Sequence, residues 1–163
     1  MIPWILLGTA ATSRNGAELR LYQRDNEFSI KADSQELMNS QVHGSEDVLA
    51  KLACEKIANH PEVRVLVGGL GLGYTLRAAL NELKPRASVV VSEIVPEVLE
   101  WNQKFLGHLA DHPLNDDRVT VQLTDVAEMI KSGQGDYNAI MLDVDNGPQA
   151  MFQEGNDWIY TNR

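Results

Sequence analysis

The period of the apolar pattern changes along the chain. Residues 18–24 and 27–32 alternate between apolar and polar side chains on either side of a polar turn, which predicts a β-hairpin. An apolar run at residues 4–7 predicts a further short strand that ends at Gly8. Because so few strands cannot form a core alone, residues 1–44 are expected to form a small β-hairpin region packed onto a larger unit or a partner subunit.

Beyond residue 44, short apolar runs alternate with helical patterns. The runs lie at residues 63–68, 89–91, 119–123 and 138–142. The last of them is continuous, as expected of a strand that is buried on both faces of a parallel sheet. The alternation of strands with helices therefore predicts an α/β domain with a parallel sheet over residues 45–163.

A helical pattern leads into the first of these strands. Ser45 is a suitable N-cap, and acidic residues in the next turn favour the helix dipole. The helix is expected to continue to about Asn59, with an apolar stripe made of Val48, Leu49, Leu52, Ala53 and Ile57.

The turn after the first parallel strand contains most of the chemical information. Gly68, Gly69, Gly71 and Gly73 follow an apolar run and precede a helical pattern. Glycines allow a sharp turn and close approach of a ligand, and Glu93 lies 20 positions after Gly73, where a carboxylate would hold a ribose. The spacing predicts half of a nucleotide-binding βαβ unit. The alternative is a structural turn, with Glu93 only capping the next helix.

Acidic residues also follow the later strands. Asp125 follows the third strand, where it is suited both to capping the next helix and to accepting a hydrogen bond from an adenine amino group. These two roles are compatible. Asp143 and Asp145 follow the fourth strand, and Asp143 is the predicted chemical residue because buried carboxylates are costly unless they are used or paired. Asp145 is interpreted as its partner or as a turn residue.

Histidine occurs at two places where ligand binding has to be considered. His43 and Glu46 stand at the entrance of the first helix and are expected to form a wall of a substrate pocket. The alternative is a loop histidine beside an acid that favours the helix dipole. His108 and His112 have the spacing of a metal pair, but Pro113 ends a helix there and no third ligand is evident, so no metal site is predicted.

Composition narrows the possible partners. The net charge of 14 − 23 = −9 argues against nucleic acid, which requires a basic face. Residues 2–7 are too short to span a bilayer and lack a basic leader, so no membrane span or signal peptide is predicted. The single Cys54 excludes an internal disulfide. A cytoplasmic protein is expected.

The order of a Gly-rich turn, a strand-end Glu and two strand-end Asp positions gives the chain a family resemblance. It resembles the class I S-adenosylmethionine-dependent methyltransferase fold, and within that fold the spermidine synthase-like (polyamine aminopropyltransferase) branch. The segments that carry the resemblance are residues 65–77, 91–97, 118–125, 137–143 and 147–148. The N-terminal hairpin followed by His43 and Glu46 is similar to the small β domain of polyamine synthases.

The resemblance implies a Rossmann-like three-layer sandwich with parallel strand order 3-2-1-4. It also implies a truncated C-terminus, because the family's sheet continues past Pro148. Either the chain is a fragment of a longer protein, or a partner subunit covers Ile140 and Leu142. A homodimer is expected, since polyamine synthase-like proteins usually associate.

The resemblance further implies S-adenosylmethionine or its decarboxylated form as cofactor, and a small-molecule amine as substrate. Glu93 would hold the ribose hydroxyls, and Asp125 would meet the adenine. The backbone from Gly69 to Gly73 would cradle the amino acid end of the cofactor or its aminopropyl remnant. Asp143 would act on the incoming amine.

Three functions stay open at this point. The first is an aminopropyl- or methyltransferase of polyamine biosynthesis. The second is an NAD(P)-dependent oxidoreductase, since a Gly-rich turn and an acid serve that cofactor too; the strand-end Asp143 and the N-terminal hairpin count against it. The third is an inactive descendant that only binds the cofactor, because Leu72 stands where the family carries Asp.

Overall fold

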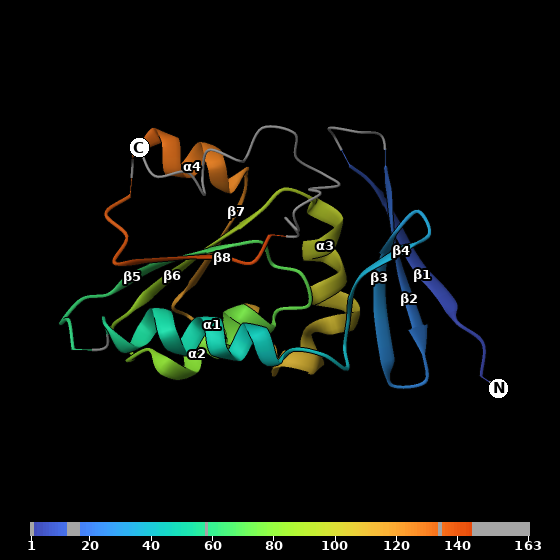
Figure 1. Ribbon diagram of the computed structural model, residues 1–163, viewed down its shortest axis with the longest axis horizontal. Helices are drawn as coiled ribbons and strands as arrows, with labels where there is room; N and C mark the ends of the chain where they lie inside the picture. The colour runs from blue at the N-terminus through green and yellow to red at the C-terminus, as the bar shows by residue number, and fades with distance from the viewer. Residues whose placement is uncertain (1, 13–16, 58, 134, 145–163) are drawn as a thin grey trace.

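Two four-stranded sheets form the frame of the molecule (Figure 1). The computed structural model describes residues 2–12, 17–57, 59–133 and 135–144. The first sheet is an antiparallel meander of β1 (Ile5–Ala11), β2 (Glu18–Arg24), β3 (Glu27–Ala32) and β4 (Gln35–Asn39). The second is fully parallel and contains β5 (Arg64–Gly68), β6 (Ser88–Glu93), β7 (Val119–Leu123) and β8 (Ala139–Leu142).

The parallel sheet has the order β7-β6-β5-β8, which confirms the predicted order 3-2-1-4. Its helices are α1 (Gly44–Glu55), α2 (Tyr74–Glu82), α3 (Pro96–Trp101) and α4 (Val126–Ser132). In Figure 1, α1 and α2 lie along one side of this sheet and α4 lies on the other. The predicted three-layer, Rossmann-like α/β fold is therefore confirmed.

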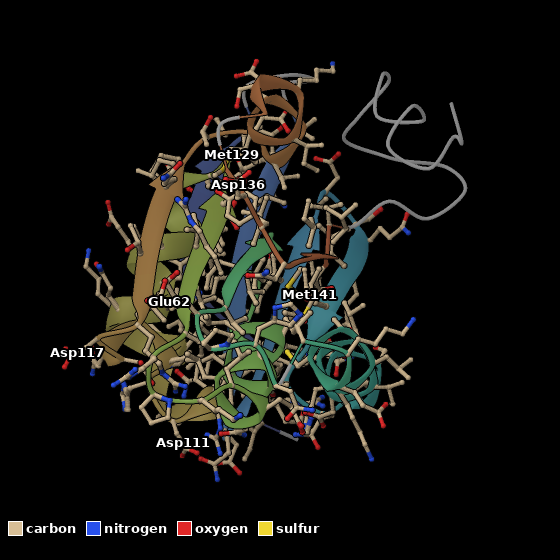
Figure 2. All side chains as sticks on the ribbon, turned by 90° about the vertical axis from the view of Figure 1, so that its left-hand side faces the viewer. Glu62, Asp111, Asp117, Met129, Asp136 and Met141 are labelled. Atoms are coloured by element: carbon tan, nitrogen blue, oxygen red, sulfur yellow. The ribbon has the colours of Figure 1, made fainter. Side chains whose placement is uncertain are left out.

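The alternation of side chains along the strands explains these layers. Val65, Val91 and Met141 are fully buried and belong to the large core that also includes α1, α2 and α3. Leu66 and Val90 point to the opposite face and pack with α4. Successive strand residues face opposite sides, so both faces need apolar cover. Figure 2 shows Met141 inside the fold.

The helical segment after α3 departs from regular α-helix. Pro96 occupies the first turn of α3, as its position in the sequence predicts. The chain continues as a π-helix, η1 (Asn102–Leu106), and then as two 3₁₀ turns, η2 (Gly107–Ala110) and η3 (Pro113–Asn115). Single π-helical turns inside α-helices occur often at functional sites.

The N-terminal hairpin prediction is confirmed with its bounds, but the sheet around it is larger than expected. The interpretation of Gly8 as the end of a strand is wrong. β1 runs through this residue to Ala11, with an irregularity in its pairing beside Gly8. A Cβ at this position would lie 2.5 Å from Nε1 of Trp101. Gly8 therefore lets α3 pack closely onto β1.

Helix α1 begins and ends earlier than predicted. His43, rather than Ser45, occupies the N-cap position. The Ser45 hydroxyl donates to the Glu46 carboxylate, 2.6 Å away, and therefore does not cap the helix. The α-helix ends at Glu55 instead of about Asn59.

The apolar stripe predicted for this helix is confirmed in part, because Ile57 is buried and Leu49 and Ala53 pack against the core. Its other two members, Val48 and Leu52, are 58% and 61% exposed. The buried face consists of Ala50 and Cys54, whose small side chains let α1 approach α2 and β8.

Candidate functional site

The Gly-rich turn connects β5 to α2 through an unusual backbone path. Gly69, Gly71 and Gly73 have φ values of +89°, +50° and +86°. Residues with a Cβ are strained in this left-handed region, so glycine is required at these positions. Gly73 is the N-cap of α2, and its N–H donates to the carbonyl of Leu70 at 2.8 Å.

Gly69 is also needed because the neighbouring strand approaches it. The N–H of Asp143 donates to the carbonyl of Gly68 at 2.9 Å, which extends the pairing of β5 with β8. A Cβ on Gly69 would overlap the backbone carbonyl of Asp143. The turn and the end of β8 are therefore packed directly against each other.

Glu93, the last residue of β6, faces the Gly-rich turn. Its Oε2 accepts a hydrogen bond from the N–H of Leu70 at 2.9 Å. Its Oε1 accepts from the N–H groups of Ile94 and Val95, both at 2.8 Å. The side chain thus lies between the turn after β5 and the chain leaving β6.

The carboxyl group of Glu93 is almost completely buried. The residue is only 7% exposed, and this burial raises the pKa of its carboxyl group. Hydrogen bonds from backbone N–H groups act in the opposite direction. Each carboxylate oxygen has two lone pairs, so Oε1 is fully used by the N–H groups of Ile94 and Val95, and the capacity for a ligand hydroxyl lies on Oε2.

Asp125 caps α4 and lies beside Glu93 along the sheet edge. It is 7% exposed, and its Oδ1 accepts from the N–H of Ala127 at 2.8 Å, so the predicted cap is confirmed. The hydroxyl of Ser92 donates to the carbonyl of Thr124 at 2.6 Å. This bond joins the ends of β6 and β7 immediately before the two acidic residues.

Asp143 follows β8 at the same edge. The burial expected for this carboxylate is wrong, because Asp143 is exposed. Its Oδ2 accepts a hydrogen bond from the hydroxyl of Thr75 in the first turn of α2, at 2.6 Å. Asp145 lies outside the described residues. The strand order therefore sets the spatial order of four groups along one edge of the sheet. These are Asp125, Glu93, the Gly-rich turn and Asp143.

His43 and Glu46 lie near Tyr74, at the start of α2. The His43 ring stacks on Tyr74, the first residue of α2, with ring centroids 4.5 Å apart and an interplanar angle of 23°. The Tyr74 hydroxyl donates to the carbonyl of Ser40 at 3.1 Å. Burial, and then the negative charge of Glu46, raise the pKa of Tyr74. Both candidate residues are thus close to Tyr74.

Asn102 is a site residue that the sequence pattern did not identify. Its side-chain NH₂ donates to the carbonyls of Gly71 at 2.8 Å and Val98 at 3.0 Å. It is 2% exposed and occupies the first position of η1. A polar amide on an otherwise apolar, inward-facing helix stripe was the available signal. Asn102 holds the carbonyl at the middle of the Gly-rich turn.

The hydrogen bond from Asn102 to the Gly-rich turn is expected to stabilise the protein. We expect Asn102→Ala to lower the free energy of unfolding by about 1–2 kcal/mol, because the partly buried carbonyl of Gly71 loses its amide donor. The carbonyl of Val98 keeps the backbone N–H of residue 102 as a donor. Urea unfolding followed by circular dichroism measures this change. Gln103→Ala, an exposed neighbour, is the control. Equal stability of the two variants would show that the bond to Gly71 contributes nothing.

No group of three or more His, Cys, Asp or Glu side chains in the described parts of the chain is arranged to hold a metal ion. His108 belongs to η2, whereas His112 precedes η3 with a left-handed backbone, φ +53°. No helix in these parts has both the length and the apolar character needed to cross a bilayer.

Comparison with known proteins places this geometry in context. Residues 43–157 match the family described as Spermine/spermidine synthase domain. The chain is 33% identical over 84 residues to the polyamine aminopropyltransferase of Saccharolobus solfataricus, covering 52% of this chain and 28% of the relative. It is 37% identical over 81 residues to putrescine N-methyltransferase 1 of Nicotiana tabacum, covering 49% and 21%. The chain therefore spans less than a third of each relative's length.

Solved structures share the fold. Spermidine synthase from Thermotoga maritima superposes with a TM-score of 0.70 at 16% identity, covering 91% of this chain and 50% of that one. A spermidine synthase in complex with the transition state analogue AdoDATO gives a TM-score of 0.68 at 17% identity, covering 85% and 47%. At these identities the likeness is one of fold.

Proposed function

Because the family match spans more than half of its residues, the chain belongs to the spermine/spermidine synthase family, and we propose that it is an alkylating transferase. The proposed cofactor is S-adenosylmethionine or its decarboxylated form. The proposed acceptor is a small amine of the polyamine class. The relatives include both an aminopropyltransferase and an N-methyltransferase, so the transferred group is an aminopropyl or a methyl group.

The observation that supports this proposal most is the row of acidic groups and backbone along one sheet edge. A nucleoside with a cationic tail needs acceptors for its hydroxyls, an acceptor for its base and a compact backbone for its tail. Glu93 at the end of β6 and Asp125 just after the neighbouring β7 offer the acceptors, and the Gly-rich turn offers the backbone. Ligands of open parallel sheets bind at this carboxyl edge of the strands.

Each residue then has a definite task. Glu93 accepts hydrogen bonds from the ribose hydroxyls, and the turn surrounds the tail. Asp143, exposed at the end of the next strand, attracts the amine and takes its proton as the nitrogen attacks. When bound, the sulfonium cofactor supplies a carbon that already has a good leaving group. The protein's main contribution is therefore orientation and removal of water.

Leu72 leaves the Gly-rich turn without a carboxylate at this position. It stands where the family carries Asp, and it is only 4% exposed. The turn therefore binds the cofactor tail through backbone groups rather than through a carboxylate at this position. Family membership also favours a sulfonium cofactor over NAD(P), which the acid and glycine spacing alone left open.

Calorimetric titration tests the proposed cofactor. We expect S-adenosylmethionine or its decarboxylated analogue to bind with a dissociation constant between about 1 μM and 1 mM, the usual range for enzyme ligands, and NAD not to bind. The buried acceptor Glu93 and the turn beside it are the physical reason. Binding of NAD alone, or of none of the three, would reject the proposal.

A further inference from the structure

Thr75, just after the Gly-rich turn, donates a hydrogen bond from its hydroxyl to the side chain of Asp143. Thr75 is 2% exposed and lies in the first turn of α2, two residues after Gly73. Its Oγ1 donates to Oδ2 of Asp143 across a distance of 2.6 Å. A hydrogen bond from a neutral hydroxyl to a carboxylate at this distance is short and charge-assisted.

The Gly-rich turn also holds the backbone of Asp143. The Gly68 carbonyl accepts from its N–H at 2.9 Å, and Gly69 packs against its carbonyl. An exposed Asp side chain ordinarily samples several rotamers, and fixing one of them costs conformational entropy. Here the buried, rigid Thr75 selects one orientation in advance.

Packing alone does not require a hydroxyl at this position. The other buried residues of α2 are Leu76, Ala78, Ala79 and Leu80, all of them apolar. Valine has nearly the same shape as threonine, and it suits such surroundings without needing a hydrogen-bond partner. The hydroxyl of Thr75 is therefore better explained by what it does to Asp143.

We propose that Thr75 is a positioning residue that fixes the Asp143 carboxylate toward the incoming amine. The inference rests on the proposed transferase function. Thr75 also connects the cofactor side of the site with the acceptor side, because it belongs to the helix whose N-terminus follows the Gly-rich turn. The element that surrounds the cofactor thus also aligns the group that acts on the acceptor.

Three variants test the role. We expect Thr75→Val to lower kcat by about 10- to 100-fold, the size of effect that a small misplacement of a reacting group produces. KM for the cofactor should change by less than about twofold, because binding to Glu93 and the turn is untouched. Thr75→Ser, which keeps the hydroxyl, should restore most of the activity. Thr120→Val, an exposed threonine on β7, is the matched control and should behave as the unsubstituted chain.

A second measurement separates failure of this inference from failure of the proposed function. The side-chain carboxyl ¹³C signal of Asp143, assigned by its loss in Asp143→Asn, is expected to shift in Thr75→Val and to return in Thr75→Ser. An unchanged kcat in Thr75→Val, or an equal loss with valine and serine, overturns the positioning role alone. If the unsubstituted chain has no turnover, the proposed function fails, and an unshifted Asp143 signal in Thr75→Val then overturns the contact itself.

Discussion

Asp143→Asn is expected to reduce kcat by about 10²- to 10⁴-fold, the usual contribution of a general base, while leaving cofactor binding within about twofold. The amide cannot take a proton from the amine, yet it has nearly the shape of the carboxylate. Its oxygen remains able to accept the hydroxyl bond from Thr75. Initial rates with a diamine acceptor and calorimetry with the cofactor measure the two effects separately.

Asp136→Asn provides the matched control. Asp136, which is labelled in Figure 2, is exposed and precedes β8. Asp143 follows this strand, so the two residues lie at its opposite ends. The Asp136→Asn variant should leave both rate and binding unchanged. An Asp143→Asn variant with full turnover would remove Asp143 from the mechanism. Absence of turnover in the unsubstituted chain, together with cofactor binding, would instead support the alternative of an inactive descendant.

Glu93→Gln is expected to weaken cofactor binding by about 100-fold. Hydrogen bonds to a charged acceptor contribute about 1.5–3 kcal/mol each, and two ribose hydroxyls would lose a carboxylate. Calorimetric titration of the variant gives the ratio directly. Glu97→Gln, in the first turn of α3, is a control that should bind as the unsubstituted chain does. Equal affinity in Glu93→Gln would exclude Glu93 as the ribose acceptor.

The same substitution should change how stability depends on pH. Burial raises the pKa of Glu93 in the folded protein above its ordinary value of 4.5. A raised pKa means that its contribution to stability is fully present below the unfolded pKa and is lost as pH rises through the folded pKa. Glu93→Gln lacks this loss, so its stability should improve relative to the unsubstituted chain as pH rises from about 4.5 toward neutrality. Urea unfolding at a series of pH values measures this difference.

The parts of the fold that the sequence predicted are those with a local signal. The hairpin arms, the order of the parallel strands and the start of α3 all follow from short-range periodicity, from Pro96, or from the family resemblance. The direction of Glu93 toward the turn also agrees with its spacing from Gly73. Local patterns suffice for the hairpin arms and for the start of α3, which depend on a few neighbouring residues, whereas the strand order was implied by the family resemblance.

The parts that the sequence did not predict depend on distant neighbours. Val48 and Leu52 have helical spacing, but the face of α1 that is buried is decided by the small residues that fit against α2. Gly8 continues a strand because Trp101, far along the chain, fills the space above it. The bonds from Asn102 to Gly71 and from Thr75 to Asp143 connect residues 31 and 68 positions apart. No periodicity in the sequence reports such contacts.

The central position of β5 has a consequence for synthesis of the protein. β5 ends at Gly68, and its neighbour β8 starts only at Ala139. At a translation rate of roughly 5–20 residues per second, several seconds pass between the emergence of the two strands. During that interval one edge of β5 is open to pairing with other nascent chains, and aggregation is the corresponding hazard. This edge of β5 is therefore covered only once β8, the last strand among the described residues, has been made.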